Sequence, residues 1–525
     1  MSRLTSAACL LCALALVLVS ACRREHPGSK SSTTLRIAIQ EPGSLDPAFL
    51  QGNNDFQIAS NVHRSLFAWD GQRSKVSHDL CISHEHSEDL KQWTFSLDPD
   101  ARFSDGTPVT AHDIAYSWKR LVDPSTASPG ADALAPVQGA GDCLRGASCK
   151  LGVKALSPYK LEVNLTTPQP FLPELLASPR FAPVPGGKGL EPGDLADNRT
   201  GPTSGPYAVD KWEPRQSLTL VRNPHFRGHD KLPFDTVVLR FTQSEETALV
   251  WFKSDEVDLA TGLVPFAKIE ELKSQLGSQL VMLPMRSVFY FMFNLSNAPT
   301  DSLKLRAVLA AALERQRLVE FVLRGGQSPA YTFVPDIYTE TAGFGPLPCP
   351  SLHSQSQASA SSLTSQEIEA ASGAVLAFNS GETLKAIAEF VQQTVRRSTG
   401  VYLELQPVEW KSYLAMVRKG DFQIARYSLT GGPDPIDFFH NFTTGHPNNI
   451  AGYTDPQYDN LVSLARTTAH RSKRFALLHE AHGLLCRDLP AAPVYFSTQL
   501  HLVKPRFAAS FRPNPEGIFL WADLL

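Results

Sequence analysis

Two runs of histidine and acidic residues have the residue types of a metal site but not its spacing. The run His479-Glu480-Ala481-His482 is close to the HExxH motif, which needs its histidines four residues apart so that both face one ion. Here they are three apart, so we interpret the run as the exposed face of a solvated helix. His84, Glu85 and His86 lie within the polar run HEHSED and are also interpreted as solvated. The sequence therefore predicts no metal site.

No motif for a catalytic nucleophile or a bound phosphate is present. The sequence contains neither GxSxG nor GxxxxGK, the motifs of a nucleophile elbow and a phosphate-binding loop. The run Gly186-Gly187-Lys188-Gly189 lies among prolines without a preceding strand, which is typical of a loop. A catalytic triad assembled in space stays an open alternative. The sequence predicts that the chain is not an enzyme and has no cofactor.

The stretch from Tyr427 to Phe439, YSLTGGPDPIDFF, is the segment with the clearest sign of a presented loop. Gly431 and Gly432 allow positive φ or a close approach to another surface. The prolines on either side of Asp434 end any helix or inner strand. We therefore expect a loop tip that presents something, with Asp434 as its acidic group before the aromatic residues.

The composition predicts a globular chain that does not bind nucleic acid. The 525 residues correspond to about two to four domain-sized units. Hydrophobic residues make up 42%, charged residues 19%, and the net charge is −3. This balance allows a large core and provides no basic stripe for a nucleic acid.

The N-terminus predicts export. Residues 1–21 contain one arginine and an apolar run, which is typical of a secretory signal peptide. Val19-Ser20-Ala21-Cys22 is similar to a bacterial lipobox, so we expect lipid on Cys22 and a polar tether over 22–34. The alternative is ordinary signal cleavage with Cys22 incidental. No later segment has membrane-spanning length.

An exported chain meets an oxidising compartment, in which cysteines can pair. Cys143 and Cys149 flank a short loop and are predicted to form a local disulfide. Cys81, Cys349 and Cys486 remain, an odd number whose pairing the sequence leaves open. Their spacing does not resemble a zinc site, and at least one is expected to be a free, buried thiol.

Periodicity predicts alternating strands and helices. Strands are expected at 35–40 and 288–296, and a hairpin around Ser157-Pro158. The strongest helical pattern is LKLRAVLAAALERQRLVEFVL, at 303–323. A helix that ends at Gly400 precedes a further strand. This alternation indicates an α/β, or mixed α+β, chain with at least two lobes. The simplest function for such a chain without catalytic motifs is binding of a solute by lobe closure, and a flat adhesive surface is the alternative.

One segment identifies a family. Trp93 to Pro129, WTFSLDPDARFSDGTPVTAHDIAYSWKRLVDPSTASP, resembles the signature region of extracellular solute-binding protein family 5, the peptide-binding subunits of ABC importers. The likeness continues in LGVKALSPYKLEVNLTTPQPF, SGPYAVDKW, LVRNPHF, VEWKSYL, KGDFQIAR and PVYFSTQLHLVKP. It covers nearly the whole mature chain.

The resemblance implies a class II periplasmic-binding-protein fold, with two main lobes around a hinged cleft and a third, inserted lobe. Lobe I is expected at 30–63, 178–285 and 498–525, lobe II at 64–177, and lobe III at 286–497. A peptide would lie extended between lobes I and III and pair with main chain as an added strand. Hydrated pockets would tolerate varied side chains. The expected partners are the permease and its ATPase subunits, and the protein is expected to be a monomer.

The resemblance also marks where this sequence departs from its family. Members that take peptides hold the ligand ammonium with an aspartate in a G-W-x-x-D-Y-x-D-P pattern. The position of that aspartate falls on Gly431, or on Gly432 in a shifted alignment. At a second position, where family members have a tyrosine, this chain has Gly130. Asp434 is the nearby acid that we consider as a replacement. The other expected ligand-binding residues are Gln51, Asn53, Trp410, Arg418 and Arg426.

These residues have alternative interpretations, and so does the function. Trp410 is a side-chain pocket wall or plain core, and Arg418 a carboxylate-binding group or a solvated helix-end charge. Arg426, among apolar neighbours, is expected to point into the cleft or to form an ion pair; guanidinium suits a carboxylate. The leading hypothesis is a lipid-anchored peptide-binding protein of an ABC importer. The alternatives are a binder of modified or cell-wall peptides, of haem, a nickel chelate or a sugar, or an adhesin-like protein.

Overall fold

The computed structural model describes most of the mature chain. The described residues are 33–70, 75–146, 149–186, 201–345, 347–352 and 363–524. The predicted signal peptide at 1–21, Cys22 and nearly all of the tether predicted at 22–34 lie outside them. None of the described helices is both long enough and apolar enough to cross a membrane.

One large sheet runs through the molecule. Within the described residues it holds eleven strands, of which β13 (Ser328–Pro329) pairs only with β17. The others follow the order β15 (Leu403–Val408), β14 (Ala374–Asn379), β16 (Ile424–Thr430), β12 (Leu280–Phe293), β17 (Ala491–Val503), β11 (Leu259–Thr261), β1 (Thr34–Ile39), β10 (Thr236–Phe241), β9 (Ser217–Arg222) and β8 (Tyr207–Glu213).

Strands β12 and β17 connect the two halves of this sheet. Their antiparallel register breaks between Pro284, which pairs with Thr498, and Val288, which pairs with Phe496. A bulge of this kind bends the strand and increases its twist. The boundaries predicted for lobes I and III, at 285 and 498, fall at this irregularity. The division into lobes itself stays a prediction.

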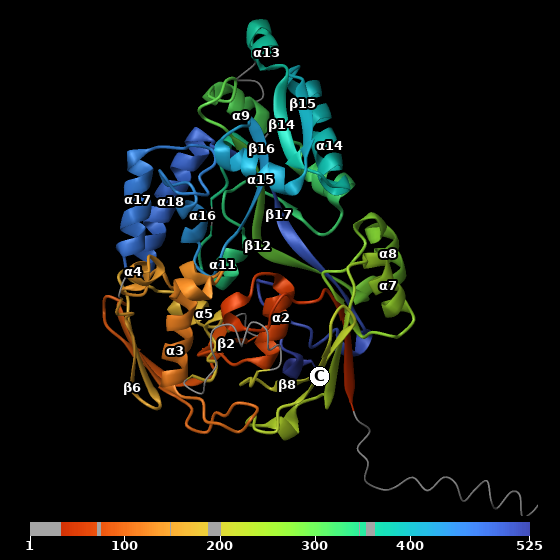
Figure 1. The fold of residues 1–525 in the computed structure, drawn as a ribbon. Helices are drawn as coiled ribbons and strands as arrows, with labels where there is room; N and C mark the ends of the chain where they lie inside the picture. Colours follow the sequence, from red (N-terminus) through yellow and green to blue (C-terminus); the bar gives the residue numbers. More distant parts are fainter. Residues whose placement is uncertain are drawn as a thin grey trace, which may run out of the picture.

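Helices cover both halves of the sheet, as Figure 1 shows. The half with β14 to β16 carries α9 (Leu303–Ala311), α13 (Ser365–Ala371), α14 (Glu382–Thr399), α15 (Trp410–Lys419), α16 (Ile436–His440), α17 (Pro456–Thr467) and α18 (Arg471–Asp488). The other half carries α2 (Asn53–Val62), α7 (Glu245–Lys253) and α8 (Ile269–Leu276). Short helices α5 (Leu172–Leu175) and α11 (Ile337–Thr341) lie where the two halves meet (Figure 1).

Strand β1 packs into two cores, one on each face of the sheet. Leu35, Ile37 and Ile39 pack in a cluster with Trp521, whereas Ala38 packs in a second cluster with side chains of α7 and α8. Successive side chains of a strand point to opposite faces, so a strand buried on both sides reads as a continuous apolar run. This confirms the strand predicted at 35–40.

The residues predicted as lobe II contain a smaller sheet. Its order is β4 (Cys81–His86), β5 (Gln92–Leu97), β7 (Lys160–Asn164) and β6 (Val153–Ser157), and a separate hairpin pairs β2 (Phe67–Asp70) with β3 (Lys75–His78).

Helix α3 (Ala111–Val122) begins after Thr110, whose backbone N–H donates to Asp113 at 2.8 Å. Thr110 is the N-cap of this helix, and Asp113 at the third helical position completes a capping box. On the buried face, Trp118 donates its Nε1–H to the carbonyl of Phe181 at 3.0 Å, and α4 (Ala140–Leu144) lies nearby.

The single helix predicted at 303–323 is wrong, because the chain breaks it near 312. It forms α9, then α10 (Arg315–Arg317) and a π-helical turn at Leu318–Leu323. Arg315 is buried, and its guanidinium donates to the carbonyls of Ala310 at 2.9 Å and Pro493 at 2.8 Å. A buried charge needs such hydrogen-bond partners. The chain therefore breaks the helix where Arg315 reaches these carbonyls, although the apolar periodicity continues.

The structure pairs four cysteines. Cys143 and Cys149 form the predicted local disulfide. Cys349 and Cys486, whose pairing the sequence left open, form a second one across 137 residues of chain. Among the described cysteines Cys81 alone is free, and it is buried, as expected for at least one thiol.

Candidate functional site

Close packing, rather than an unusual backbone angle, explains the first glycine of the 427–439 loop. Strand β16 ends at Thr430, and Gly431 then donates its N–H to the carbonyl of Arg286 at 2.9 Å. A Cβ at position 431 would lie 2.6 Å from the hydroxyl of Tyr338 and closer still to the ring of Phe438. The sequence suggested either a positive φ or a close approach to another surface at these glycines. At Gly431 the structure shows the close approach.

Two carboxylates beside the glycines serve the loop itself. Asp437 accepts the N–H of Gly432 at 2.7 Å, while the Gly432 carbonyl accepts the Tyr338 hydroxyl at 2.5 Å. Asp434 forms an ion pair with buried Arg474 and accepts the N–H of Ile436 at 3.0 Å. Asp434 therefore faces Arg474 instead of offering a free carboxylate.

Burial changes the titration of both acids. It raises the pKa of Asp434, against the opposing charge of Arg474. Burial, together with the charge of Asp434, raises the pKa of Asp437 to about 7. A carboxyl group near its pKa at neutral pH carries only part of its charge. The loop therefore holds fewer full negative charges than its sequence suggests.

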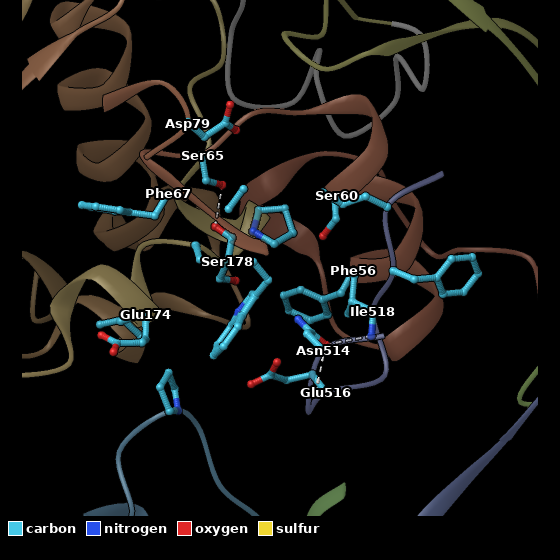
Figure 2. A pocket seen from close by; sticks show the side chains of 18 of the residues that line it. Phe56, Ser60, Ser65, Phe67, Asp79, Glu174, Ser178, Asn514, Glu516 and Ile518 are labelled. Atoms are coloured by element: carbon cyan, nitrogen blue, oxygen red, sulfur yellow. Dashed lines mark hydrogen bonds between the residues drawn. The ribbon is translucent and has the colours of Figure 1, made fainter. Parts of the chain in front are cut away.

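A cavity of about 300 Å³ lies beside this loop, within the size range of small-ligand pockets of about 300–1,000 Å³. Its walls come from separate parts of the chain, as Figure 2 shows. The residues predicted as lobe I supply Asn53, Phe56, Ser60, Ser178, Asn514, Glu516 and Ile518, those of lobe II supply Phe67, Trp69 and Glu174, and the loop supplies Gly432 and Pro433. The cavity thus joins all three predicted lobes.

Glu516 is neutralised where it enters the cavity. It forms an ion pair with Arg286, which is 1% exposed. The guanidinium of Arg286 also lies over the rings of Trp69, at 5.3 Å, and Tyr338, at 5.5 Å. Cation–π contacts of this kind are stronger in desolvated surroundings. This group of residues connects the three predicted lobes at the base of the cavity.

Glu174 is the cavity carboxylate without a partner. Within the described residues its carboxylate forms no ion pair. Burial raises the pKa of Glu174, while the charges of Arg471 and Arg286 oppose that rise. Figure 2 places Glu174 and Glu516 on opposite sides of the lower part of the cavity. Glu174 is therefore available to a cation from a ligand.

Part of strand β16 also has a free edge next to the loop. Strand β14 pairs with β16 only at Ile424 and Ala425. On that side, residues 427–430 have no neighbouring strand among the described residues, whereas the Arg426 carbonyl accepts the Tyr413 hydroxyl. A free edge allows an extended peptide to add as a further strand.

Five of the predicted ligand-binding residues fall into two groups. Asn53 and Gly432 line the cavity, and exposed Gln51 stands just before α2, donating its N–H to Asp55 at 3.0 Å. Trp410 and Arg426 form a second group, with the guanidinium 5.5 Å from the indole ring. The remaining predicted residues, Arg418, Gly431 and Asp434, do not line the cavity.

The second group is held by aromatic and amide contacts. Arg426 donates its Nε–H to the side chain of Asn379 at 2.5 Å and lies 5.9 Å from the ring of Tyr413. Trp410 is 48% exposed, so the alternative that it is plain core is wrong. Arg418 is exposed in the last turn of α15, which favours its interpretation as a solvated charge.

Gly130 is another position where the space for a side chain is already occupied. A Cβ there would collide with the guanidinium of Arg180. Arg180 donates to the carbonyl of Leu50 at 2.7 Å and lies 5.1 Å from the ring of Phe56. Arginine thus occupies the space into which a side chain at 130 would project.

The two histidines of the His479–His482 run pack against other side chains of the protein. The interpretation of this run as a solvated face is wrong for His482. His482 is buried and accepts the N–H of Phe333 at 3.2 Å. His479 stacks on Phe344 at 4.6 Å. Burial lowers the pKa of His482 to about 4. Both rings therefore pack inside the helical part of the molecule.

Comparisons with known proteins identify the family. The model of the bacterial extracellular solute-binding proteins, family 5, matches residues 75–449. The chain belongs to this family. It is 30% identical over 502 residues to the periplasmic murein peptide-binding protein MppA of Escherichia coli, covering 92% of this chain and 91% of MppA. It is 30% identical to the periplasmic oligopeptide-binding protein OppA of Salmonella typhimurium, covering 90% and 88%.

Solved structures agree with this assignment. The unliganded open form of the MppA periplasmic murein tripeptide binding protein matches with a TM-score of 0.78 at 29% identity, covering 94% of this chain and 97% of that one. A second structure, of the Escherichia coli murein tripeptide binding protein, has a TM-score of 0.75 at 28% identity, covering 94% and 98%. The predicted family and the mixed α/β fold are confirmed. The family consists of solute-binding proteins.

Sequence reasoning missed Glu174, Glu516, Arg286 and Trp69. One signal was present, since Glu174 is a lone acid in the apolar run FLPELLA, and acids are rarely buried without a reason. The others carry no local signal. Their importance arises only when distant segments meet.

Proposed function

We propose that this chain is the peptide-binding component of a bacterial ABC importer, held to the cell envelope by lipid on Cys22. A peptide ligand is supported by the names of two relatives. MppA is named for binding murein peptide, and OppA is named for binding oligopeptides. The observation that carries the proposal is the cavity formed by all three predicted lobes with an unpaired carboxylate on its wall. The protein acts as a monomer and delivers its ligand to the permease and its ATPase subunits.

Binding uses the main chain for affinity. An extended peptide pairs with the free edge of β16 at 427–430 and with the segment from Gln51 to Asn53. Closure around the irregular strands β12 and β17 then covers the ligand. Main-chain pairing does not read side chains, so peptides of different sequence are accepted. Trp410 and Arg426 contact a ligand side chain or carboxylate beyond the cavity.

Glu174 takes the role that an acid at position 431 would have. Gly431 has no room for a side chain, Asp434 is paired with Arg474, and Asp437 binds the loop backbone. That leaves the Glu174 carboxylate to receive the ligand's α-ammonium. The resulting charge-assisted hydrogen bond stabilises the complex by about 1.5–3 kcal/mol.

The test compares Glu174→Gln with wild type by calorimetric titration. For a tripeptide with a free α-ammonium, Kd should rise about 10–100-fold in the variant, because each 1.4 kcal/mol corresponds to a factor of ten. For the N-acetylated tripeptide, wild type and variant should bind equally. Glu88→Gln, an exposed acid in the same predicted lobe, is the matched control and should leave both affinities unchanged.

The outcomes separate the function from the residue. If wild type binds neither peptide, the proposed peptide-binding function is contradicted. If wild type binds both peptides and Glu174→Gln weakens neither, the function stands and the role of Glu174 is contradicted. Preferential binding of the acetylated peptide by wild type would instead favour modified or cell-wall peptides without a conventional ammonium.

A further inference from the structure

Three metal-binding side chains meet at one edge of the inserted sheet. His78 ends β3, Cys81 begins β4, and His84 follows on β4. One ligand atom from each residue lies within 4.8 Å of the others. Nε2 of His78 is 2.9 Å from Nδ1 of His84. These three side chains form what we call the His-Cys-His cluster.

The cluster has the donors and nearly the size of a zinc site. Zinc binds imidazole nitrogen at about 2.0–2.1 Å and thiolate sulfur at about 2.3 Å, so tetrahedral ligand atoms lie about 3.3–3.8 Å apart. A shift of under about 1 Å per side chain brings the observed atoms to that spacing. The motif His-x2-Cys-x2-His differs from the trio His84, Glu85 and His86 that the sequence suggested was solvated, because it includes Cys81 at the start of β4 and His78 from before the turn at 79–80.

Burial gives the cluster a closed side and an open side. Cys81 is 0% exposed, His84 is half-buried, and His78 is exposed. An ion reaches the cluster from the His78 side, where water completes its coordination.

Aromatic rings fix the orientation of the two histidines. The Phe67 ring lies 5.5 Å from His78 and 5.4 Å from His84, and Trp93 stacks on His84 at 5.7 Å. Phe67 and Trp69, on β2, also line the ligand cavity. The cluster thus lies behind the cavity wall, where the β2–β3 hairpin meets the four-stranded sheet.

We propose that His78, Cys81 and His84 bind one Zn²⁺ and so fasten the β2–β3 hairpin, which lines the ligand cavity, to strand β4. On binding, the Cys81 thiol releases its proton to solvent and its sulfur forms a bond to zinc. Each histidine supplies one nitrogen lone pair, and a water molecule fills the fourth position. The ion is structural: it adds a cross-link between two strand pairs and takes no part in a reaction.

The test is calorimetric titration of the full mature chain, without an affinity tag, with Zn²⁺ alone. Wild type should bind one equivalent. His78→Ala and His84→Ala should each weaken binding at least about tenfold, the size of change seen even for outer-shell contacts. His86→Ala is the matched control, because His86 lies on the same strand outside the cluster, and should bind as wild type does.

Two further readouts identify the sulfur ligand. Co²⁺ in place of Zn²⁺ should give an absorption band from sulfur-to-cobalt charge transfer that is lost in Cys81→Ser. Titration in buffers of different ionisation enthalpy should show about one more proton released by wild type than by Cys81→Ser. His78 is exposed, so His78→Ala keeps the test decisive even if Cys81→Ser does not fold. Absence of Zn²⁺ binding, or equal binding by wild type and both histidine variants, would overturn the proposal.

Discussion

At the scale of single residues, Gly431 determines what the loop can present. We predict that Gly431→Ala lowers the free energy of unfolding by about 1–3 kcal/mol, because an added methyl group forces the surrounding side chains apart. The methyl group would meet the ring of Phe438 and the hydroxyl of Tyr338. Urea unfolding followed by circular dichroism measures the change.

Gly483→Ala is the control for that prediction. Gly483 lies in α18, and nothing stands within 4 Å of a Cβ built there. Alanine is favoured over glycine in a helix by about 1 kcal/mol, so this variant should be as stable as wild type or more so. Equal stability of Gly431→Ala and wild type would contradict the close packing of the loop.

Asp437 makes the stability of the protein depend on pH through the same loop. Its folded pKa of about 7 lies above the ordinary value of an aspartate. Its contribution to stability is therefore fully present below the unfolded pKa, near 4, and is lost as the pH rises through about 7. Asparagine keeps an oxygen to accept the Gly432 N–H but never ionises.

We therefore predict that the stability of Asp437→Asn relative to wild type increases from pH 5 to pH 8. The measurement is the free energy of unfolding of both proteins across that range. Glu88→Gln, an exposed acid, should show a constant difference from wild type. A difference for Asp437→Asn that shrinks with rising pH would contradict the raised pKa.

At the scale of elements, the Cys349–Cys486 disulfide joins the segment after α11 to the end of α18. In the chain-entropy description, closing its long loop stabilises the fold by about 5 kcal/mol, against about 2 kcal/mol for the short Cys143–Cys149 loop. We predict that the Cys349→Ser, Cys486→Ser double variant is destabilised more than the Cys143→Ser, Cys149→Ser variant. Thermal unfolding without reductant compares them, and the reverse order would contradict the prediction.

The sequence predicted elements well where the signal is local. The apolar run of β1 and the glycine that ends α14, at Gly400 with φ +79°, are properties of neighbouring residues. The prediction of one helix at 303–323 was wrong because the break depends on Arg315. The carbonyl partner of Arg315, Pro493, is far along the chain. Periodicity does not reveal such a partner.

At the scale of the whole molecule, the site is a product of the topology. Asn53, Glu174, Gly432 and Glu516 lie far apart in sequence and meet at one cavity. The resemblance to the family pointed to Asn53 and Gly432. It did not point to Glu174, because the family position for an acid lies in the loop. The way distant segments of the chain fold together places Glu174 on the cavity wall, and no local pattern encodes that arrangement.

Native mass spectrometry of the mature chain, purified without refolding, tests the central claim of peptide binding most directly. We predict an added mass that fragments into a short peptide, and, once that peptide is removed, a return of the added mass on mixing with a tripeptide. An added mass that corresponds to haem or a nickel chelate would contradict the claim. So would a chain that stays ligand-free both as purified and after peptide is added.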